Sequence, residues 1–321
     1  MKSNKNRVNP FWVIVNKEIS DTVKSWRFII MIALVFLTSM GSLYTALSSF
    51  SSAVKPNEPE GSFFFLKLFT ISDGTLPPFI IFISFLGPLL GISMGFDSIN
   101  SEQNKGTLSR ILSQPIYRDY ILNAKFLAAL IILSILFLAL GLLVLGFGLI
   151  FIGIPPTPDE LLRIIIFILV SIVYVSFWLN LSILFSVRFR QTTTSALAGI
   201  SVWLFFSIFF NMIVNLIAKG IAPTRVVSEN QLISLQRVIQ NIMRINPGQL
   251  FQDATTTLLV PSVRSLGPLT MEQMSGAIPN PLPLGQSIML VWPQVTALVA
   301  GTLVFFAIAY AMFMRREIRS R

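Results

Sequence analysis

The chain of 321 residues is 54% hydrophobic and 12% charged, whereas soluble globular domains carry about 25% charged residues, so we expect a polytopic membrane protein. It contains no Cys and no His, which excludes disulfides, thiolate metal sites, Cys nucleophiles and the usual serine-hydrolase triad. The net charge of +10 comes from basic residues that flank hydrophobic segments, which indicates membrane topology and argues against a nucleic-acid-binding protein.

Residues 9–27 precede the first apolar segment and are predicted to form an amphipathic helix. Asn9 can cap this helix, and Pro10 suits its first position. The apolar residues that recur at helical spacing are Phe11, Val15, Ile19, Val23 and Trp26. An interfacial helix lying in the cytoplasmic leaflet is favoured, because a span begins directly after Arg27. The alternative is a helix packed on protein.

Six apolar segments are long enough to cross the hydrocarbon core of a bilayer, which takes about 20 residues. They lie at 28–49, 78–97, 121–151, 162–186, 194–218 and 288–313. The expected fold class is therefore an all-α polytopic membrane protein, with residues 1–321 in one transmembrane domain. Most Lys and Arg residues lie on one side of these spans, which places both termini in the cytoplasm and the protein in the plasma (cell) membrane.

The second span carries glycine at every fourth position, a pattern that lets helices approach closely in lipid. These glycines are Gly87, Gly91 and Gly95. Two alternatives stay open for them. They serve ordinary packing within the subunit, or they face a second subunit or a transport pathway.

The segment 98–118 between the second and third spans is polar but patterned. A short cytoplasmic helix is predicted from Thr107, bounded by hinges at Gly106 and Pro115. Its apolar residues share one face, which suits a groove on another protein. These apolar residues are Leu108, Ile111 and Leu112, and the charged residues nearby are Asp97, Glu102 and Arg110. Which of Glu102 and Arg110 contacts the partner stays open.

The fifth span carries three polar residues on one face, Ser207, Asn211 and Asn215. Asparagine at membrane depth is costly unless it is paired or faces water. The stripe therefore either bonds a neighbouring helix or lines a polar pathway. After this span, residues 219–287 are expected to form a small helical cap, external or re-entrant, with a helix in 226–245 that Asn246-Pro247-Gly248 ends. The Pro-rich stretch 278–285 is expected to be extended.

Several activities lack their motifs. The dipeptide Gly-Lys, which a phosphate-binding loop requires, does not occur, so this chain is not expected to be an ATPase or to bind a cofactor or metal. The centres of the six predicted spans lack Asp, Glu, Lys and Arg, which argues against an intramembrane enzyme and weakens an ion-coupled carrier. A self-sufficient channel or secondary carrier and a membrane scaffold that moves nothing remain as alternatives to a transporter subunit.

A motif surrounds the third span's beginning. An acidic residue follows the second span, then Glu-x-x-x-Gly-Thr-Leu, a run ending in Leu-Ser-x-Pro, a basic residue and Lys-Phe. In this chain these residues are Asp97, Glu102, Gly106, Thr107, Leu108, Leu112, Ser113, Pro115, Arg118, Lys125 and Phe126. Together with residues 17–21 and 245–247, the motif resembles the ABC-2 type permease family. The likeness is to the subgroup of the nitrous oxide reductase copper-maturation permease and the gliding-motility-type permeases.

The resemblance implies a six-helix permease that pairs with a second, identical or related, copy. Separate ATP-binding-cassette subunits would dock beneath it and bind the ATP and Mg²⁺. In this family the helix between the second and third spans is the coupling helix, and the N-terminal amphipathic helix is the connecting helix. The second and fifth helices usually face the pathway. The resemblance implies an exporter and leaves the substrate unidentified.

Overall fold

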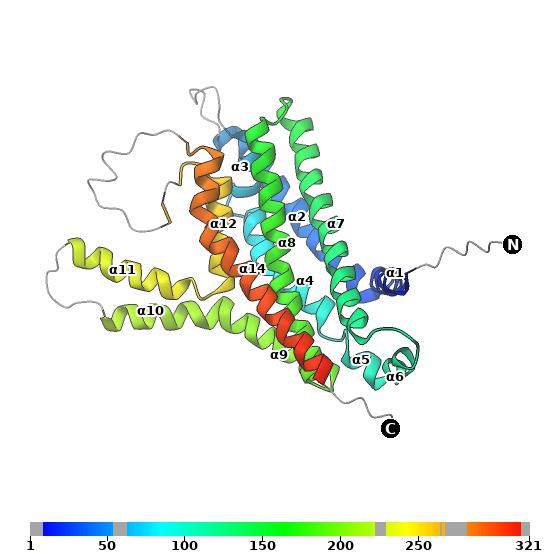
Figure 1. Ribbon diagram of the computed structural model, residues 1–321. Coiled ribbons are helices and arrows are strands. Elements are labelled where there is room, and N and C mark those ends of the chain that lie inside the picture. The colour runs from blue at the N-terminus through cyan, green and yellow to red at the C-terminus, as the bar shows by residue number, and fades with distance from the viewer. Residues whose placement is uncertain (1–8, 54–62, 222–228, 264, 267–280, 316–321) are drawn as a thin grey trace.

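The computed structural model describes residues 9–53, 63–221, 229–263, 265–266 and 281–315 (Figure 1). Every regular element among these residues is a helix. The helices are α1 (Pro10–Val23), α2 (Trp26–Ala53), α3 (Phe64–Thr70), α4 (Phe79–Gly95), α5 (Asn100–Asn104), α6 (Thr107–Leu112), α7 (Arg118–Ile152), α8 (Pro158–Arg188), α9 (Thr192–Leu204), the π-helical turn η1 (Phe205–Phe209), α10 (Phe210–Ile221), α11 (Glu229–Met243), α12 (Pro247–Leu259) and α14 (Leu284–Arg315).

Six helical stretches in the described chain are long and apolar enough to cross a membrane, which confirms the predicted fold class. They are Trp26–Ser49, Phe79–Asn104, Arg118–Ile152, Pro158–Arg188, Thr192–Ile221 and Leu284–Arg315. The protein is therefore a multi-pass membrane protein. α7 is 35 residues long, in keeping with the length of the third apolar segment.

α8 is the most buried of these six spans and runs through the middle of the bundle (Figure 1). It packs against α4, α7, α9, α12 and α14. A capping box starts the helix: Thr157 Oγ1 accepts the amide of Glu160, and the Glu160 carboxylate accepts the amide of Thr157. Tyr174 and Trp178 are buried in its middle, so this helix supplies the centre of the core.

The glycines of the second span lie where α4 packs on α8, and all three are buried. A Cβ added at Gly91 would lie 2.6 Å from the carbonyl oxygen of Val175. One added at Gly95 would lie 2.7 Å from the carbonyl oxygen of Leu179. A backbone carbonyl cannot move aside as a flexible side chain can, so the two helices touch only because Cβ is missing. Of the two alternatives, the stripe with Gly87 serves packing within the subunit.

Pro88 lies inside α4 and carries no amide hydrogen, so the carbonyl of Ser84 one turn earlier lacks its helical partner. The hydroxyl of Tyr174 on α8 donates to that carbonyl oxygen over 2.9 Å. A neighbouring helix thus satisfies the group that the proline leaves open, as membrane-embedded helices require.

α1 begins as the sequence predicts, with Asn9 Oδ1 accepting the Phe11 amide and Pro10 at the first helical position. Val15 is fully buried against α7, where small alanine side chains allow close approach. This face of α1 is packed on protein, which was the alternative reading of the apolar spacing. The large apolar residues of α1 that stay exposed, as an interfacial helix would have them, are Trp12, Val13 and Val23.

α12 is the main structural finding in 219–287. The sequence predicts the break at Asn246, and α11 does end before it, but a second helix begins at once. Asn246 caps α12 by accepting the Gly248 amide, and Pro247 occupies the first helical position. α12 packs against α3, α4, α8 and α14, so this part of the segment lies against the helical bundle and is not a separate cap. Its fully buried residues include Phe251, Ala254 and Leu258.

The ends of the 219–287 segment also differ from expectation. α14 begins at Leu284, four residues before the predicted sixth span. Residues 281–283 precede it without helix, in keeping with the Pro-rich stretch, and 278–280 lie outside the described residues.

The fifth span consists of α9, η1 and α10 and is the least buried of the six. α10 and α11 contact each other and project away from the bundle (Figure 1). Asn215 lies on α10 and is exposed. The polar stripe predicted for this span is therefore not on one continuous buried face.

Arg163 of α8 is completely buried, although it reads in the sequence only as one of a few basic residues near the non-cytoplasmic side. Its Nε lies 2.7 Å from Asp159 Oδ2. Its Nη atoms donate to the carbonyl oxygens of Leu258 at 3.1 Å and Leu282 at 2.6 Å, and to Ser287 Oγ at 3.1 Å. The planar guanidinium has enough donors to hold α8, the end of α12 and the start of α14 together.

Candidate functional site

The predicted coupling segment, residues 97–115, forms two short helices, α5 and α6. They are separated by Gly106, whose φ of +69° lies in the left-handed region that favours glycine. The Thr107 hydroxyl donates to the carbonyl oxygen of Glu102 over 3.2 Å and closes the turn. α6 begins at Thr107, and Pro115 follows it as an exposed residue. The hinge at Gly106 therefore lies where the sequence places it.

The apolar face of α6 does not point where the sequence suggests. Leu108 is 3% exposed and belongs to the main hydrophobic core, and Ile111 packs against that core. The expectation that Leu108 contacts a partner is wrong here, because a six-residue helix beside the bundle buries its own apolar face first. The side chain of Leu112 lies outside what the structure describes. Arg110 is the exposed residue among those of α6 whose side chains the structure describes.

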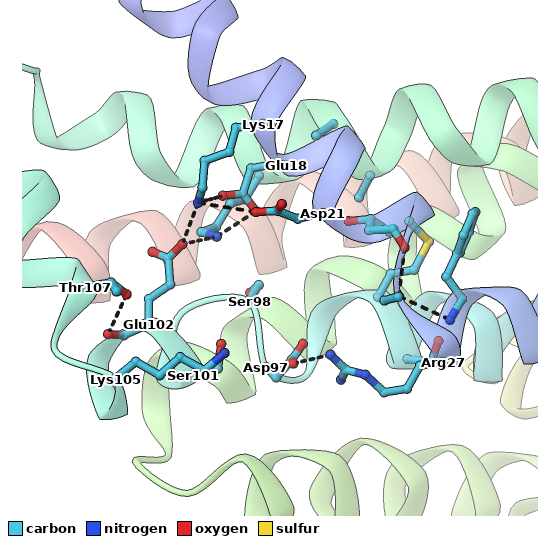
Figure 2. Close-up of a pocket in the computed structure, with 18 residues that line it drawn as sticks. Lys17, Glu18, Asp21, Arg27, Asp97, Ser98, Ser101, Glu102, Lys105 and Thr107 are labelled. Atoms are coloured by element: carbon cyan, nitrogen blue, oxygen red, sulfur yellow. Dashed lines mark hydrogen bonds and ion pairs between the residues drawn. The ribbon is translucent and has the colours of Figure 1, made fainter.

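A buried ion cluster ties the coupling segment to the rest of the protein (Figure 2). Lys125 on α7 is 8% exposed. Its Nζ lies 2.8 Å from Glu18 Oε2 of α1 and 2.9 Å from Glu102 Oε1 of α5. Lys17 lies 3.3 Å from Glu18 and 3.7 Å from Glu102. We call these four residues the Lys125 cluster. Glu102 therefore makes its contacts within this chain, whereas the side chain of Arg110 is exposed.

The electrostatics of the cluster favour the charged forms of Glu18 and Lys17. Burial opposes ionisation of Glu18, but the attraction of Lys125 and its hydrogen bond outweigh burial and lower the pKa of Glu18. Burial likewise opposes the charge on Lys17, and the neighbouring Glu18 and Glu102 carboxylates nevertheless raise its pKa. Two carboxylates from different elements therefore share one buried ammonium group.

Asp97 makes a second tie at the other end of the coupling segment. Its Oδ2 lies 2.6 Å from Arg27 Nη2 at the start of α2, and this guanidinium also lies over the Phe96 ring at 5.1 Å. The pair borders the same cleft as the Lys125 cluster (Figure 2). Because Arg27 is half exposed, the pair contributes little to stability and mainly fixes position.

An apolar groove opens between α1 and α6. We call it the α1–α6 groove. Its apolar lining comes from Pro10, Val13, Ile14, Ile111, Pro115, Ile116 and Ile121. Three members of the Lys125 cluster, Lys17, Glu18 and Glu102, form its polar edge with Lys125 beneath. A groove of this composition is suited to an amphipathic helix of another protein.

A polar cavity lies where α4, α8, the fifth span and α12 meet. Its polar lining consists of Ser84, Tyr174, Ser207, Asn211, Asn246, Gln249 and Gln252, and we call it the amide cavity. Two of the three polar residues predicted for the fifth span, Ser207 and Asn211, lie in it, and Asn215 does not. Gly87, Gly91 and Gly95 do not line it either, because they face α8.

Asn246 organises the amide cavity. Its Nδ2 donates to the carbonyl oxygen of Phe206 over 2.9 Å, while its Oδ1 accepts the Gly248 amide. Phe206 lies in η1, and a π turn disturbs the regular ladder that would otherwise use such carbonyls. The Oδ1 atom of Asn211 is buried and has no hydrogen-bond partner among the described residues. It is therefore a ready acceptor for water or a ligand.

Sequence reasoning missed the α12 half of the cavity and the Lys125 cluster as a structural unit. A signal for the first exists: Gln249 and Gln252 are three apart after an Asn-Pro-Gly start, opposite apolar residues at helical spacing. The second has no local signal, because Glu18, Glu102 and Lys125 are far apart in the chain.

The sequence was also compared with known proteins. The sequence pattern of the ABC-2 family transporter proteins matches residues 12–318. The chain is similar to the probable ABC transporter permease protein NosY of Pseudomonas aeruginosa, with 25% identity over 314 residues, which covers 96% of this chain and 98% of that protein. It is also similar to the protein of the same name from Stutzerimonas stutzeri, with 22% identity over 316 residues, 96% of this chain and 99% of the relative.

Proposed function

Because the chain belongs to the ABC-2 family of transporter proteins, we propose that it is the transmembrane permease subunit of an ATP-driven exporter. A separate nucleotide-binding subunit binds and hydrolyses ATP with Mg²⁺, and a second permease copy completes the membrane unit. Both termini lie in the cytoplasm of a cell whose plasma membrane holds the complex, in keeping with the distribution of basic residues.

The observation that carries this proposal is the attachment of the coupling segment to α1 and α7 through Lys125. A nucleotide-binding subunit that holds Arg110 and fills the α1–α6 groove moves α6 when ATP draws two such subunits together. Glu102 and Glu18 grip one buried ammonium group, so α5, α1 and α7 follow as one rigid body. The movement can be driven only if the partner binds the two arrangements with different affinity.

The amide cavity is the proposed start of the transport pathway. It is bounded by the fifth span, which is little buried, and by α4, which packs on the central α8. Asn211 Oδ1 supplies an acceptor without a partner in the described chain. A shift of α4 relative to α10 would change this cavity first.

The test uses the absence of Cys. A single Ser113→Cys substitution, at the exposed end of α6 and outside the α1–α6 groove, can be spin-labelled without background. In the complex with its nucleotide-binding subunit, trapping with ATP and vanadate is expected to change the distance between the two permease labels. Lys125→Met is expected to abolish the change, and the exposed-lysine control Lys105→Met is expected to keep it. A chain that associates with no ATPase contradicts the proposal.

A cation-coupled carrier is the second candidate, because α12 brings one carboxyl group into the bundle. Asp253 is 9% exposed, and its Oδ2 has no hydrogen-bond partner among the described residues, with Arg244 Nε at 4.0 Å. Gradient-driven flux in vesicles that contain this chain alone, lost on Asp253→Asn, would establish the carrier in place of the ATP-driven exporter.

A further inference from the structure

Three arginines converge at the end of the bundle where α8 and α14 finish. Arg188 is the last residue of α8, Arg190 lies in the link to α9, and Arg315 is the last residue of α14. They line one cavity with Val187, Phe189 and Met312, which we call the arginine cleft. Its volume of about 630 Å³ is within the range of small-ligand pockets. Figure 1 shows the end of α14 beside the α8–α9 link.

Within the described residues, the arginine cleft holds three positive charges and no counter-charge. No carboxylate lines it, and none of its arginines forms an ion pair within the described part of the chain. Lys17, Arg27 and Lys125, on the same side of the protein, all contact carboxylates. A basic residue in the last turn of a helix interacts favourably with the helix dipole. This interaction explains the presence of Arg188 and of Arg315, each taken alone. It does not account for Arg190, which lies outside α8, or for the convergence.

The position and chemistry of the cleft fit a lipid. Two spans end at it, so it lies where the chain leaves the hydrocarbon, and the positive-inside rule assigns this end to the cytoplasmic leaflet. Guanidinium groups bind phosphate oxygens in a bidentate manner, and basic pockets between transmembrane helices on the cytoplasmic side take anionic headgroups. Phe189 and Met312 supply apolar surface beside the charges, which a free anion in water would not need.

We propose that the arginine cleft is a binding site for the phosphate headgroup of an anionic phospholipid, with Arg188, Arg190 and Arg315 as its ligands. The site joins the ends of the central α8 and the last span through one lipid. It does not depend on what the protein transports or on the ATPase subunit.

The purified full chain is tested by native mass spectrometry with phosphatidylglycerol and, for comparison, phosphatidylcholine. The triple variant Arg188→Gln/Arg190→Gln/Arg315→Gln is expected to lose phosphatidylglycerol affinity on the order of 100-fold, since each basic residue near an anionic surface contributes about fivefold. Phosphatidylcholine binding is expected to be unchanged. The control Lys24→Gln/Lys105→Gln/Arg110→Gln removes the same charge from exposed positions at the same end and is expected to keep the affinity.

Three results would overturn the proposal. Equal phosphatidylglycerol affinity in the arginine triple and the control triple shows general electrostatic attraction only. Displacement of the lipid by millimolar glycerol phosphate shows a small-anion site. Loss of ATPase-subunit association in the arginine triple, with lipid binding intact, shows a protein interface. The triple Arg→Lys variant controls for misfolding, because it keeps the three positive charges. It is expected to retain selectivity for phosphatidylglycerol but to bind it more weakly.

Discussion

The hydroxyl of Tyr174 and the carbonyl oxygen of Ser84 lie 2.9 Å apart, and the hydrogen bond between them replaces the one that Pro88 removes from α4. This bond explains how a proline persists in the middle of a span that also packs tightly. The Ser182 hydroxyl of α8 likewise donates to the Ile92 carbonyl of α4 over 3.0 Å, so the largely apolar α4–α8 contact is polar at both points.

Tyr174→Phe is therefore expected to destabilise the protein by about 1–3 kcal/mol, because the Ser84 carbonyl is left buried without a partner. The measurement is an SDS-unfolding titration of the purified protein. Tyr44→Phe is the matched control, since Tyr44 is 73% exposed. Equal midpoints for the two variants would show that water or another group satisfies the carbonyl.

Gly91→Ala is expected to destabilise the helix pair by about 1–3 kcal/mol, because the new methyl group meets the Val175 carbonyl at 2.6 Å and the helices must separate. Gly146→Ala, in α7, meets nothing within 4 Å and is expected to stabilise the protein by about 0.5–1 kcal/mol. The same SDS-unfolding titration measures the stability of both variants. If both substitutions changed the stability in the same direction, the packing role of Gly91 on α8 would be contradicted.

Arg163→Met is expected to cost about 3 kcal/mol, because it leaves the carbonyls of Leu258 and Leu282 without their buried donor. Arg163→Lys keeps the charge but cannot reach three acceptors at once, so an intermediate loss is expected. Hydrogen exchange on α12 and at the start of α14 is the more specific readout. Unchanged protection in Arg163→Met would mean that Arg163 does not hold these segments.

Lys125→Met leaves two carboxylates facing each other and is expected to release α1 from α7. Trypsin cleavage after Lys24, between α1 and α2, is expected to accelerate at least about tenfold, since loss of one partner of a buried pair costs several kcal/mol. Lys105→Met, at an exposed position on the same segment, should leave the rate unchanged. Adding Glu102→Gln to Lys125→Met should partly restore protection, and failure of this rescue would argue for lost packing in place of lost charge.

The pH dependence of cleavage in the link between α1 and α2 follows from the pKa directions. The pKa of Glu18 is lowered from 4.5, so its contribution to stability is fully present above about pH 4.5 and is lost as the pH falls through the lower folded-state pKa. The pKa of Lys17 is raised from 10.5, so its contribution is lost only as the pH rises past that value. Cleavage with an acid-tolerant protease is expected to be flat near neutrality and to accelerate in acid. Glu18→Gln should flatten the acid limb, and an unchanged limb would place the titration elsewhere.

The six spans follow from the sequence because lipid demands about 20 apolar residues per crossing, and this rule needs no tertiary information. The helix starts at Pro10 and Thr107 follow for a similar reason, since capping and left-handed glycine act within a few residues. The burial of Leu108 and of Arg163 could not be predicted this way. The burial of each side chain depends on which helix packs against it. The sequence alone shows only that Leu108 is apolar and that Arg163 is basic.

α12 escaped prediction for a different reason. Its thirteen residues are too short to span a membrane and too polar on one face to stand out by hydropathy, so its place among α4, α8 and α14 depends on their spacing. The same spacing brings Gln249 and Gln252 to the fifth span's Asn211. A cavity assembled from elements so far apart in the chain has no local sequence pattern.

The π turn at η1 gives the amide cavity a mechanical property. A π turn holds about one residue more than an α turn, so rewinding Phe205–Phe209 into α-helix would turn everything after it by about 100° and shift it by about 1.5 Å. A rotation of that size would carry Asn211 away from its present place in the cavity lining. The polarity of this cavity is thus set by the winding of one helical turn as much as by the residues that line it.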